Sequence, residues 1–441
     1  MTTSATPAPP SPRAVALAAM SGQTIEYYDF YIYGTVSAFV LGPLFFPSAN
    51  HLVSTLTAFA TFGVGFLARP LGAILFGHLG DRVGRKKTLV ITLWGMGLAT
   101  CLVGVLPVYG QAGVIAPIAL VVLRFVQGIC VGGEWGGATL LSVEHAPRGK
   151  DGFYGSFPQL GSPLGLLLST AMILLVGLMP HPAFLSWGWR IPFLFSSVLL
   201  VIGFLIRARV PESPQFEAAR ETSRQVKVPL LDTLRTCPKP LLAGLAATFL
   251  TTGGYFLVNT FTITYATQEL GLPQQVGLIG QIVTSIVQAS LILVVGAWSM
   301  RRSPRLLATA AALLVAAWAF PFYGLMQTGA PVAIWLGQAV ATVFQTGLWA
   351  VLPSLLAAQF PVHLRYTGIS LSLQGSAMIG GFTPFIATYL LSVFHSVWSV
   401  AGLLAIVALV SAAGCWASRS RPSAEEAGVA GMRPAAVETA D

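Results

Sequence analysis

Long apolar segments recur along nearly the whole chain, and they constrain its fold more than any other feature. Of the 441 residues, 55% are hydrophobic and only 9% are charged. A helix needs about 20 apolar residues to cross the hydrocarbon core of a bilayer. The sequence therefore predicts an all-α membrane protein with twelve transmembrane helices. We place them at 15–42, 52–76, 88–107, 114–140, 154–179, 190–206, 241–265, 275–299, 305–326, 331–357, 367–392 and 397–417.

Lysine and arginine residues fall unevenly among the connections between these segments. If the N terminus is cytoplasmic, the cytoplasmic segments hold all of the 24 Lys and Arg residues except Arg69, Arg124 and Arg190. Membrane proteins concentrate Lys and Arg in cytoplasmic loops. The pattern thus predicts a multi-pass protein of a bacterial inner or plasma membrane with both termini in the cytoplasm. The net charge of +9 reflects this topology, and no nucleic-acid partner is expected.

One long polar connection divides the chain into two halves. Residues 207–240 separate a bundle of six expected helices at 15–206 from a second bundle at 241–417. Residues 1–14 and 418–441 are rich in small and polar residues, so we expect disordered cytoplasmic tails. Two pseudo-symmetric bundles with a site between them at the membrane midplane are typical of a secondary transporter.

Several motifs resemble those of one transporter family. "GHLGDRVGRKKTL" resembles the loop signature of the major facilitator superfamily, and "RFVQGICVGGEWGG" resembles its fourth-helix motif. "EYYDFYIYG", "FATFGVGFLARPLG", "WGWRIPF" and "RYTG" narrow the resemblance to the metabolite:proton symporter family. "GGEWGGATLLSVEHAP" and "LSWGWRIPFLFS" look most like its shikimate transporter branch. The resemblance covers nearly the whole chain, and it implies the major facilitator fold and symport of a metabolite with a proton.

The resemblance also implies a role for the loop after the second helix. Asp81 matches the position that holds the two halves of the superfamily together on the cytoplasmic side, with Arg85 as its partner and Arg82 beside it. We therefore expect these residues to act in gating; the alternative is a solvated cluster that only sets topology. After the eighth helix, Met300 and Arg301 stand where the family commonly has an Asp–Arg pair, so the halves differ here.

Three charged residues fall near the middle of predicted helices. At 1.5 Å per residue, Glu26 and Asp29 lie about 17 to 21 Å along the first helix and Arg124 about 15 Å along the fourth, near the midplane of the bilayer. Intramembrane charges are costly and usually functional. Loss of water favours a neutral acid, whereas a nearby guanidinium favours the carboxylate. A solute that takes the arginine would therefore change the proton affinity of the acid.

We accordingly expect Asp29, with Glu26, to carry the proton and Arg124 to bind a solute carboxylate through its two parallel donors. A fixed ion pair that only sets helix packing is the alternative. Glu134, near the cytoplasmic end of the fourth helix, is expected to gate proton release or to cap the inward side. Snorkelling of Arg69 toward the interface is the interpretation that we favour for that residue.

Uncharged polar residues complete the expected solute site. Tyr33 shares a helix face with both carboxylates, and Gln127 shares one with Arg124. In the second half, no helix holds a charge, and hydrogen-bonding side chains there suit hydroxyl groups of a solute. Bridging between helices is the alternative for each. These residues are Tyr255, Asn259, Thr260, Gln281, Gln288, Gln345, Trp349 and Gln374.

Glycines recur at four-residue spacing in the predicted fourth helix. They are Gly128, Gly132 and Gly136. Small residues at this spacing let two membrane helices approach closely. We therefore expect the fourth helix to be tightly packed, which would hold Arg124 at a fixed depth.

The predicted function is proton-coupled import of a small organic anion, such as shikimate or a related hydroxy- or dicarboxylate, by alternating access. Alternatives are an uncoupled facilitator or exporter of a metabolite, and a symporter of a zwitterionic osmolyte such as betaine or proline. An enzyme or an ATP-driven pump is not expected, because no catalytic constellation or phosphate-binding loop is present. The four cysteines show no metal-ligand spacing, so neither metal nor cofactor is expected. The expected partners are the solute, a proton and membrane lipid, and the protein is expected to be a monomer.

Overall fold

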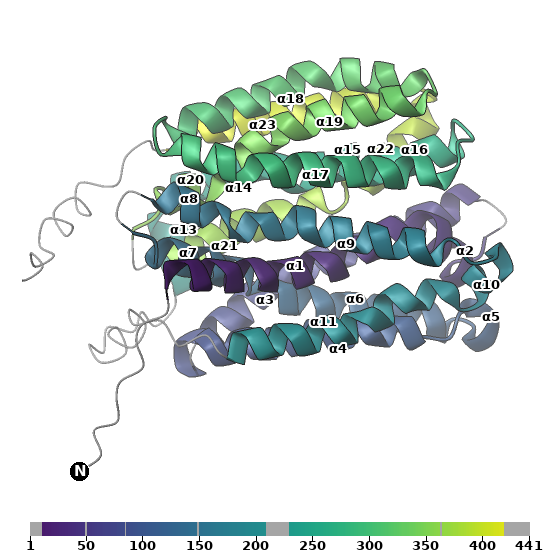
Figure 1. The fold of residues 1–441 in the computed structure, drawn as a ribbon, viewed down its shortest axis with the longest axis horizontal. Coiled ribbons are helices and arrows are strands. Elements are labelled where there is room, and N and C mark those ends of the chain that lie inside the picture. The colour runs from purple at the N-terminus through teal and green to yellow at the C-terminus, as the bar shows by residue number, and fades with distance from the viewer. Residues whose placement is uncertain are drawn as a thin grey trace, which may run out of the picture.

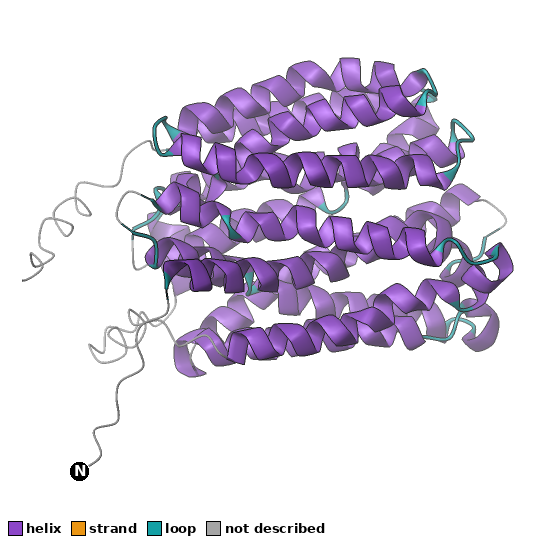
Figure 2. Ribbon diagram, viewed as in Figure 1, coloured by secondary structure: helices purple, strands orange, loops and turns teal. Residues whose placement is uncertain are grey.

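The computed structural model describes residues 11–48, 51–83, 85–147, 150–208, 229–361 and 364–418. Those ranges are largely helical and contain no strand (Figure 2). The long helices run side by side along the longest axis of the molecule, and their connections gather at its two ends (Figure 1). The predicted all-α fold is therefore confirmed.

The first half of the chain, coloured purple to teal in Figure 1, contains its six expected spans as helices of at least sixteen residues. Shorter helical pieces and one π-helical turn connect or extend them. The elements are α1 (Pro12–Val36), a π-helical turn (Ser37–Leu41), α2 (Gly42–Phe45), α3 (His51–Val83), α4 (Arg85–Val105), α5 (Tyr109–Ala112), α6 (Ile115–Gly132), α7 (Trp135–Glu144), α8 (Asp151–Ser156), α9 (Gly161–Val176), α10 (His181–Ser186) and α11 (Ile191–Ala208).

The second half, coloured green to yellow, repeats this organisation. Its elements are α13 (Pro229–Thr236), α14 (Pro238–Phe249), a π-helical turn (Leu250–Gly254), α15 (Tyr255–Val258), α16 (Thr260–Gln268), α17 (Gln274–Ser299), α18 (Pro304–Gln327), α19 (Pro331–Trp349), α20 (Leu352–Ala357), α21 (Arg365–Gly380), α22 (Thr383–Phe394) and α23 (Trp398–Ala417).

Ten helical segments in the described part of the chain are long and apolar enough to cross a membrane. The other two expected spans coincide with α1, which carries Glu26 and Asp29, and with α4, whose apolar part is the shorter stretch Val90–Val105. Each of the twelve predicted segments thus coincides with helix. α1 begins at Pro12, inside the predicted tail, because Ser11 caps it by accepting a hydrogen bond from the amide of Ala14 at 3.3 Å.

Several predicted spans are not continuous α-helices. The fourth is broken between α6 and α7 at Gly133 and Glu134, and the seventh contains the π-helical turn Leu250–Gly254. Irregular backbone inside a membrane requires surrounding protein or a water-filled cavity, and π-helical turns often occur at functional sites. Continuous spans were predicted at these positions, because apolar periodicity does not report single-residue breaks.

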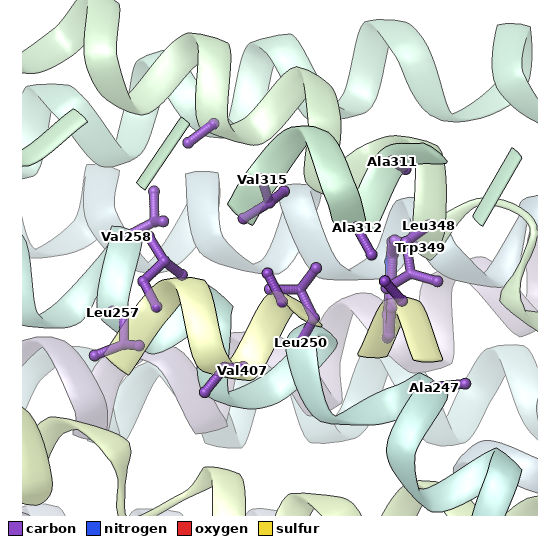
Figure 3. Packing of buried hydrophobic residues seen from close by; sticks show 14 of the residues in the cluster. Ala247, Leu250, Leu257, Val258, Ala311, Ala312, Val315, Leu348, Trp349 and Val407 are labelled. Carbon is purple, nitrogen blue, oxygen red and sulfur yellow. The ribbon is translucent and has the colours of Figure 1, made fainter. Parts of the chain in front are cut away.

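The two halves contact each other along long helices. α9 lies beside α17, as Figure 1 shows, and α3 packs against α21. The hydrophobic core of the second half joins residues from α14, α15, α18, α19 and α23 (Figure 3), including Leu250, Val258, Val315, Leu348 and Val407. A second cluster fills the first half but also contains Phe256 and Leu278 from the second. Apolar packing therefore continues across the boundary between the halves.

α3 and α6 approach each other backbone to backbone. A Cβ atom on Gly128 would lie 1.9 Å from the carbonyl oxygen of Gly65, and one on Gly132 would lie 2.0 Å from that of Arg69. No side chain fits at either position. The packing prediction is confirmed for these two glycines, and the close contact fixes α6, and with it Arg124, against α3.

Candidate functional site

A chain of hydrogen bonds links Asp29 to Arg124 across four helices. The Asp29 carboxylate on α1 accepts from the hydroxyl of Ser196 on α11 and, at 3.1 Å, from that of Thr100 on α4. The Thr100 oxygen accepts from Nε2 of Gln127 at 2.7 Å. Oε1 of Gln127 accepts from Nη1 of Arg124 at 2.9 Å, both on α6. We call these five residues the polar relay.

The relay differs from a simple ion pair. Asp29 and Arg124, which are 2% and 3% exposed, are joined through the uncharged side chains of Gln127 and Thr100. The Thr100 hydroxyl has one hydrogen but two acceptors in reach, the Asp29 carboxylate at 3.1 Å and the carbonyl oxygen of Met96 at 3.0 Å. It can therefore donate to either one, depending on whether Asp29 is charged.

Aromatic rings and glycine enclose the Arg124 guanidinium. Its Cζ lies 3.9 Å from the centroid of the Tyr33 ring and 5.3 Å from that of Phe62. A Cβ atom on Gly65 would lie 3.2 Å from Nη2, a tight contact that would require the guanidinium to shift. Within the described part of the chain, Nε has no hydrogen-bond partner. Cation–π contacts and one relay hydrogen bond thus hold Arg124, and the predicted solute residue Tyr33 packs against it.

Arg69 on α3 is a second guanidinium in the interior. Its Cζ lies 4.2 Å from the centroid of the Phe66 ring and 4.8 Å from that of Phe30. The side chain is half-buried and lines two cavities. It lies within electrostatic range of Glu26. The snorkelling that we favoured for Arg69 is wrong, because π-faces and an internal cavity surround its charge.

The larger of the two cavities, of about 60 Å³, lies between the two halves. We call it the central cavity. It has room for a few water molecules, so a solute would require it to widen. Four of the predicted solute residues line it: Tyr255, Gln288, Gln345 and Trp349. Its other lining residues include Tyr27, Tyr31, Arg69, Ser162, Thr251 and Thr252.

The smaller cavity, of about 20 Å³, lies within the first half and has room for about one water molecule. We call it the side cavity. Asp29, Arg124 and Gln127 line it, and Arg69 lines both cavities. The structure therefore brings the relay next to the central cavity, with Arg69 where the two meet.

Five predicted solute residues line neither cavity: Tyr33, Asn259, Thr260, Gln281 and Gln374. Gln281 on α17 accepts hydrogen bonds through Oε1 from Thr170 on α9 at 3.1 Å and from Thr35 on α1 at 3.5 Å. Asn259 accepts one from Thr284 at 2.8 Å. Both are 1% exposed. In this structure Gln281 bridges the two halves, and Asn259 braces α16 against α17.

The two remaining carboxylates of the prediction are also buried. Glu26 is 5% exposed, and its Oε2 accepts from Nε2 of Gln23 at 2.7 Å. Glu134 is fully buried at the break between α6 and α7, directly before the first residue of α7. Neither lines a cavity. An acid at a helix N terminus is favourable, so the break itself accounts for part of the cost of burying Glu134.

The side chains of the predicted gating residues Asp81, Arg82 and Arg85 lie outside the part of the chain that the structure describes. Their backbones place Asp81 and Arg82 in the last turn of α3 and Arg85 at the start of α4. Among the described residues no cluster of His, Cys, Asp or Glu could hold a metal ion.

Thr100 and Ser196 are site residues that were not predicted from the sequence. Both are small hydroxyl residues in apolar helices, where threonine and serine commonly bond to their own backbone. Only the contact of α4 and α11 with α1 shows that they donate to Asp29. For Arg69 a signal was available, because it is one of the three basic residues that do not fit the loop pattern.

Comparison with known proteins agrees with this architecture. The family described as "Sugar (and other) transporter" matches residues 14–228. The shikimate transporter of Escherichia coli is 40% identical over 410 residues, which cover 91% of this chain and 93% of that protein. The proline/betaine transporter of Escherichia coli is 33% identical over 410 residues, covering 90% of this chain and 81% of that protein.

A solved structure shares the fold. The proton:xylose symporter XylE bound to 6-bromo-6-deoxy-D-glucose superimposes with a TM-score of 0.73, covering 92% of this chain and 95% of that one. The two sequences are 17% identical, so this likeness concerns the fold alone.

Proposed function

This chain belongs to the major facilitator superfamily of membrane transporters, within its sugar transporter family, and on that premise we propose that it imports a small organic anion together with a proton. The observation that carries the proposal is the polar relay. It connects a buried acid to a buried guanidinium through groups that can change donor and acceptor roles. In this proposal Asp29 binds the proton.

Charge balance around the cavities supports coupling. Arg124 and Glu134 lie within electrostatic range of Asp29, and Glu26 lies within electrostatic range of Arg69. Protonation of Asp29 removes one negative charge from this region of low dielectric. An anionic solute restores one negative charge, so each of the two ligands favours the binding of the other. Proton and anion together add no net charge to the interior.

The hydroxyl of Thr100 provides a local route for this coupling. While Asp29 is ionised, the Thr100 hydroxyl donates to it and accepts from Gln127, which in turn accepts from Arg124. Once Asp29 is protonated, Thr100 is free to turn toward the Met96 carbonyl oxygen. The protonated Asp29 can then donate to the Thr100 oxygen, which also accepts from Gln127. This competition is the proposed route by which the proton affects Gln127 and, through it, Arg124.

Alternating access requires the halves to separate at one end at a time. We propose that both termini are cytoplasmic, which puts the Gln281 bridge toward the outer face and the loop with Asp81, Arg82 and Arg85 at the cytoplasmic gate. Glu134, near that gate, is the proposed exit point for the proton. Inter-half hydrogen bonds occur on both sides of the central cavity: Gln281 to α1 and α9 on one, and Trp349 Nε1 to the carbonyl oxygen of Gln159 at 3.4 Å on the other.

The proposed solute is shikimate or a related hydroxylated carboxylate. The similarity to a shikimate transporter supports it, and so do the uncharged hydrogen-bonding groups that line the second half of the cavity. A zwitterionic osmolyte is the second candidate. The aromatic side chains Tyr27, Tyr31, Tyr255 and Trp349 around the cavity could accept a quaternary ammonium group, and a proline/betaine transporter is among the relatives.

The test is uptake of radiolabelled shikimate by proteoliposomes that contain the purified protein. We expect accumulation with an acidic exterior and none after a protonophore collapses the gradient. Thr100→Val, which breaks the relay, should reduce accumulation, whereas Thr309→Val removes a hydroxyl bonded only to the carbonyl oxygen of Arg305 and serves as a matched control. Equal uptake with and without the gradient would identify a facilitator.

A further inference from the structure

The guanidinium of Arg69, in the interior of the molecule, has N–H donors that are not used in hydrogen bonds to described residues. No described residue accepts a hydrogen bond from it or forms an ion pair with it. Its contacts are the π-faces of Phe30 and Phe66, which leave the N–H edge of the group available. An arginine side chain carries five N–H donors in a fixed fork. These donors border the central cavity, where a solute would enter between the halves.

Arg124 is in the opposite situation. It lines only the side cavity, it donates to Gln127, and its guanidinium lies against Tyr33, Phe62 and the backbone at Gly65. A solute between the halves would have to displace aromatic packing to reach it. Arg69, by contrast, is already in the wall of the central cavity.

The other walls of the central cavity carry no charged group among the described residues. From the second half come the amides of Gln288 and Gln345 and the hydroxyls of Thr251 and Thr252. Nε2 of Gln345 has no hydrogen-bond partner within the described chain. The aromatic rings of Tyr27 and Trp349 lie 6.4 Å apart and provide an apolar surface. One cation therefore faces several uncharged donors and acceptors.

We propose that Arg69, rather than Arg124, binds the carboxylate of the solute, and that this single cation opposite uncharged amides selects monoanionic, hydroxylated solutes over dianions. The inference deepens the proposed symport and rests on it. It offers an alternative to the expectation that Arg124 binds the solute carboxylate. In this proposal Arg124 acts through the relay and links occupancy of the cavity to the proton on Asp29.

Electrostatics explains the selectivity. A monocarboxylate can satisfy Arg69 with two parallel hydrogen bonds while its hydroxyls bond to Gln288 and Gln345. A second carboxylate on the solute would lie against amides and aromatic rings without a cation, and burying an unpaired charge is costly. A zwitterion would place its cationic end in the same region, where no carboxylate lines the wall in the described part of the chain.

Isothermal titration calorimetry of the purified full-length protein tests the proposal. The ligands are shikimate, its methyl ester, succinate and betaine, and the proteins are wild type, Arg69→Gln, Arg69→Lys and Arg124→Gln. We expect wild type to bind shikimate at least about tenfold more tightly than the other three ligands, and Arg69→Gln to lose roughly 30-fold or more of that affinity. Arg69→Lys keeps the charge but not the fork, so its loss should be smaller.

Arg124→Gln should bind shikimate better than Arg69→Gln does, but it should fail to accumulate it under a pH gradient in proteoliposomes. If Arg69→Gln does not fold, Arg69→Lys carries the comparison. Stronger loss of shikimate binding in the Arg124 variant than in the Arg69 variants would overturn the assignment, as would equal affinity of wild type for shikimate and succinate. Shikimate binding by wild type without proton-driven accumulation would instead reject the symport and leave the Arg69 assignment intact.

Discussion

The two halves of this protein share an architecture but differ in the polar groups that they bury. The first half buries Glu26, Asp29, Arg124 and Glu134. Among the described residues of the second half, the buried polar side chains are amides and hydroxyls, such as Gln281, Gln338 and Gln374. A buried ionisable group responds strongly to a proton or a counter-ion, whereas a buried amide offers fixed hydrogen bonds at lower cost. We therefore propose that the first half couples transport to the proton and that the second half recognises the shape of the solute.

The largest effect of a mutation on stability is expected for the packing of α6 against α3 in the first half. Gly128→Ala would place a methyl group 1.9 Å from the carbonyl oxygen of Gly65, so α6 must move away from α3. Overpacking of this kind costs about 3 kcal/mol. Thermal unfolding in detergent should show a clearly lower midpoint for this variant. Gly402→Ala on α23, where no atom lies within 4 Å of an added Cβ, is the control and should change stability little.

The second effect concerns coupling. Asp29→Asn keeps the shape of the relay but removes the titratable group, so proton-driven accumulation should disappear while solute exchange across the membrane continues. Each unit of pH difference is worth about 1.4 kcal/mol per coupled proton, or about tenfold accumulation, and the variant should lose that factor. Steady-state uptake in proteoliposomes at several imposed gradients measures it.

Gln345→Ala is the matched variant from the second half. It removes an amide of the central cavity and should weaken solute binding while the accumulation ratio at saturating solute stays dependent on the gradient. Two results would contradict the proposed difference between the halves. One is accumulation by Gln345→Ala that no longer depends on the pH gradient, and the other is accumulation by Asp29→Asn that still depends on it.

The smallest effect should come from the bridge between the halves. Gln281→Leu removes the acceptor for Thr170 and Thr35, and two such hydrogen bonds are together worth about 1 kcal/mol. The population open at that end should rise about fivefold, which distance measurements between spin labels on α2 and α16 can detect. Gln338→Leu breaks a bond of 2.9 Å to the carbonyl oxygen of Val258 inside the second half. It should leave the distance distribution unchanged.

Much of the fold could be predicted from the sequence, because a helix that crosses the hydrocarbon core of a bilayer must be apolar and about 20 residues long. Apolar length located each spanning segment, and the glycine spacing on α6 predicted the contact that Gly128 and Gly132 make with α3. The midplane depth that we expect for Asp29 and Arg124 rests on helical rise alone. These features depend on local composition and on the helical period of 3.6 residues. They can therefore be predicted from the sequence without knowledge of tertiary contacts.

What the tertiary structure decided is which side chains meet. The hydroxyls of Thr100 and Ser196 join Asp29 only because α4 and α11 pack against α1, and Gln281 became a bridge because α17 lies beside α9. Arg69 and Arg124 are both single arginines in apolar helices, and only the three-dimensional arrangement assigns one to the cavity wall and the other to the relay. The sequence predicts how far along its helix a residue lies, but the rotation and contact of helices determine its neighbours.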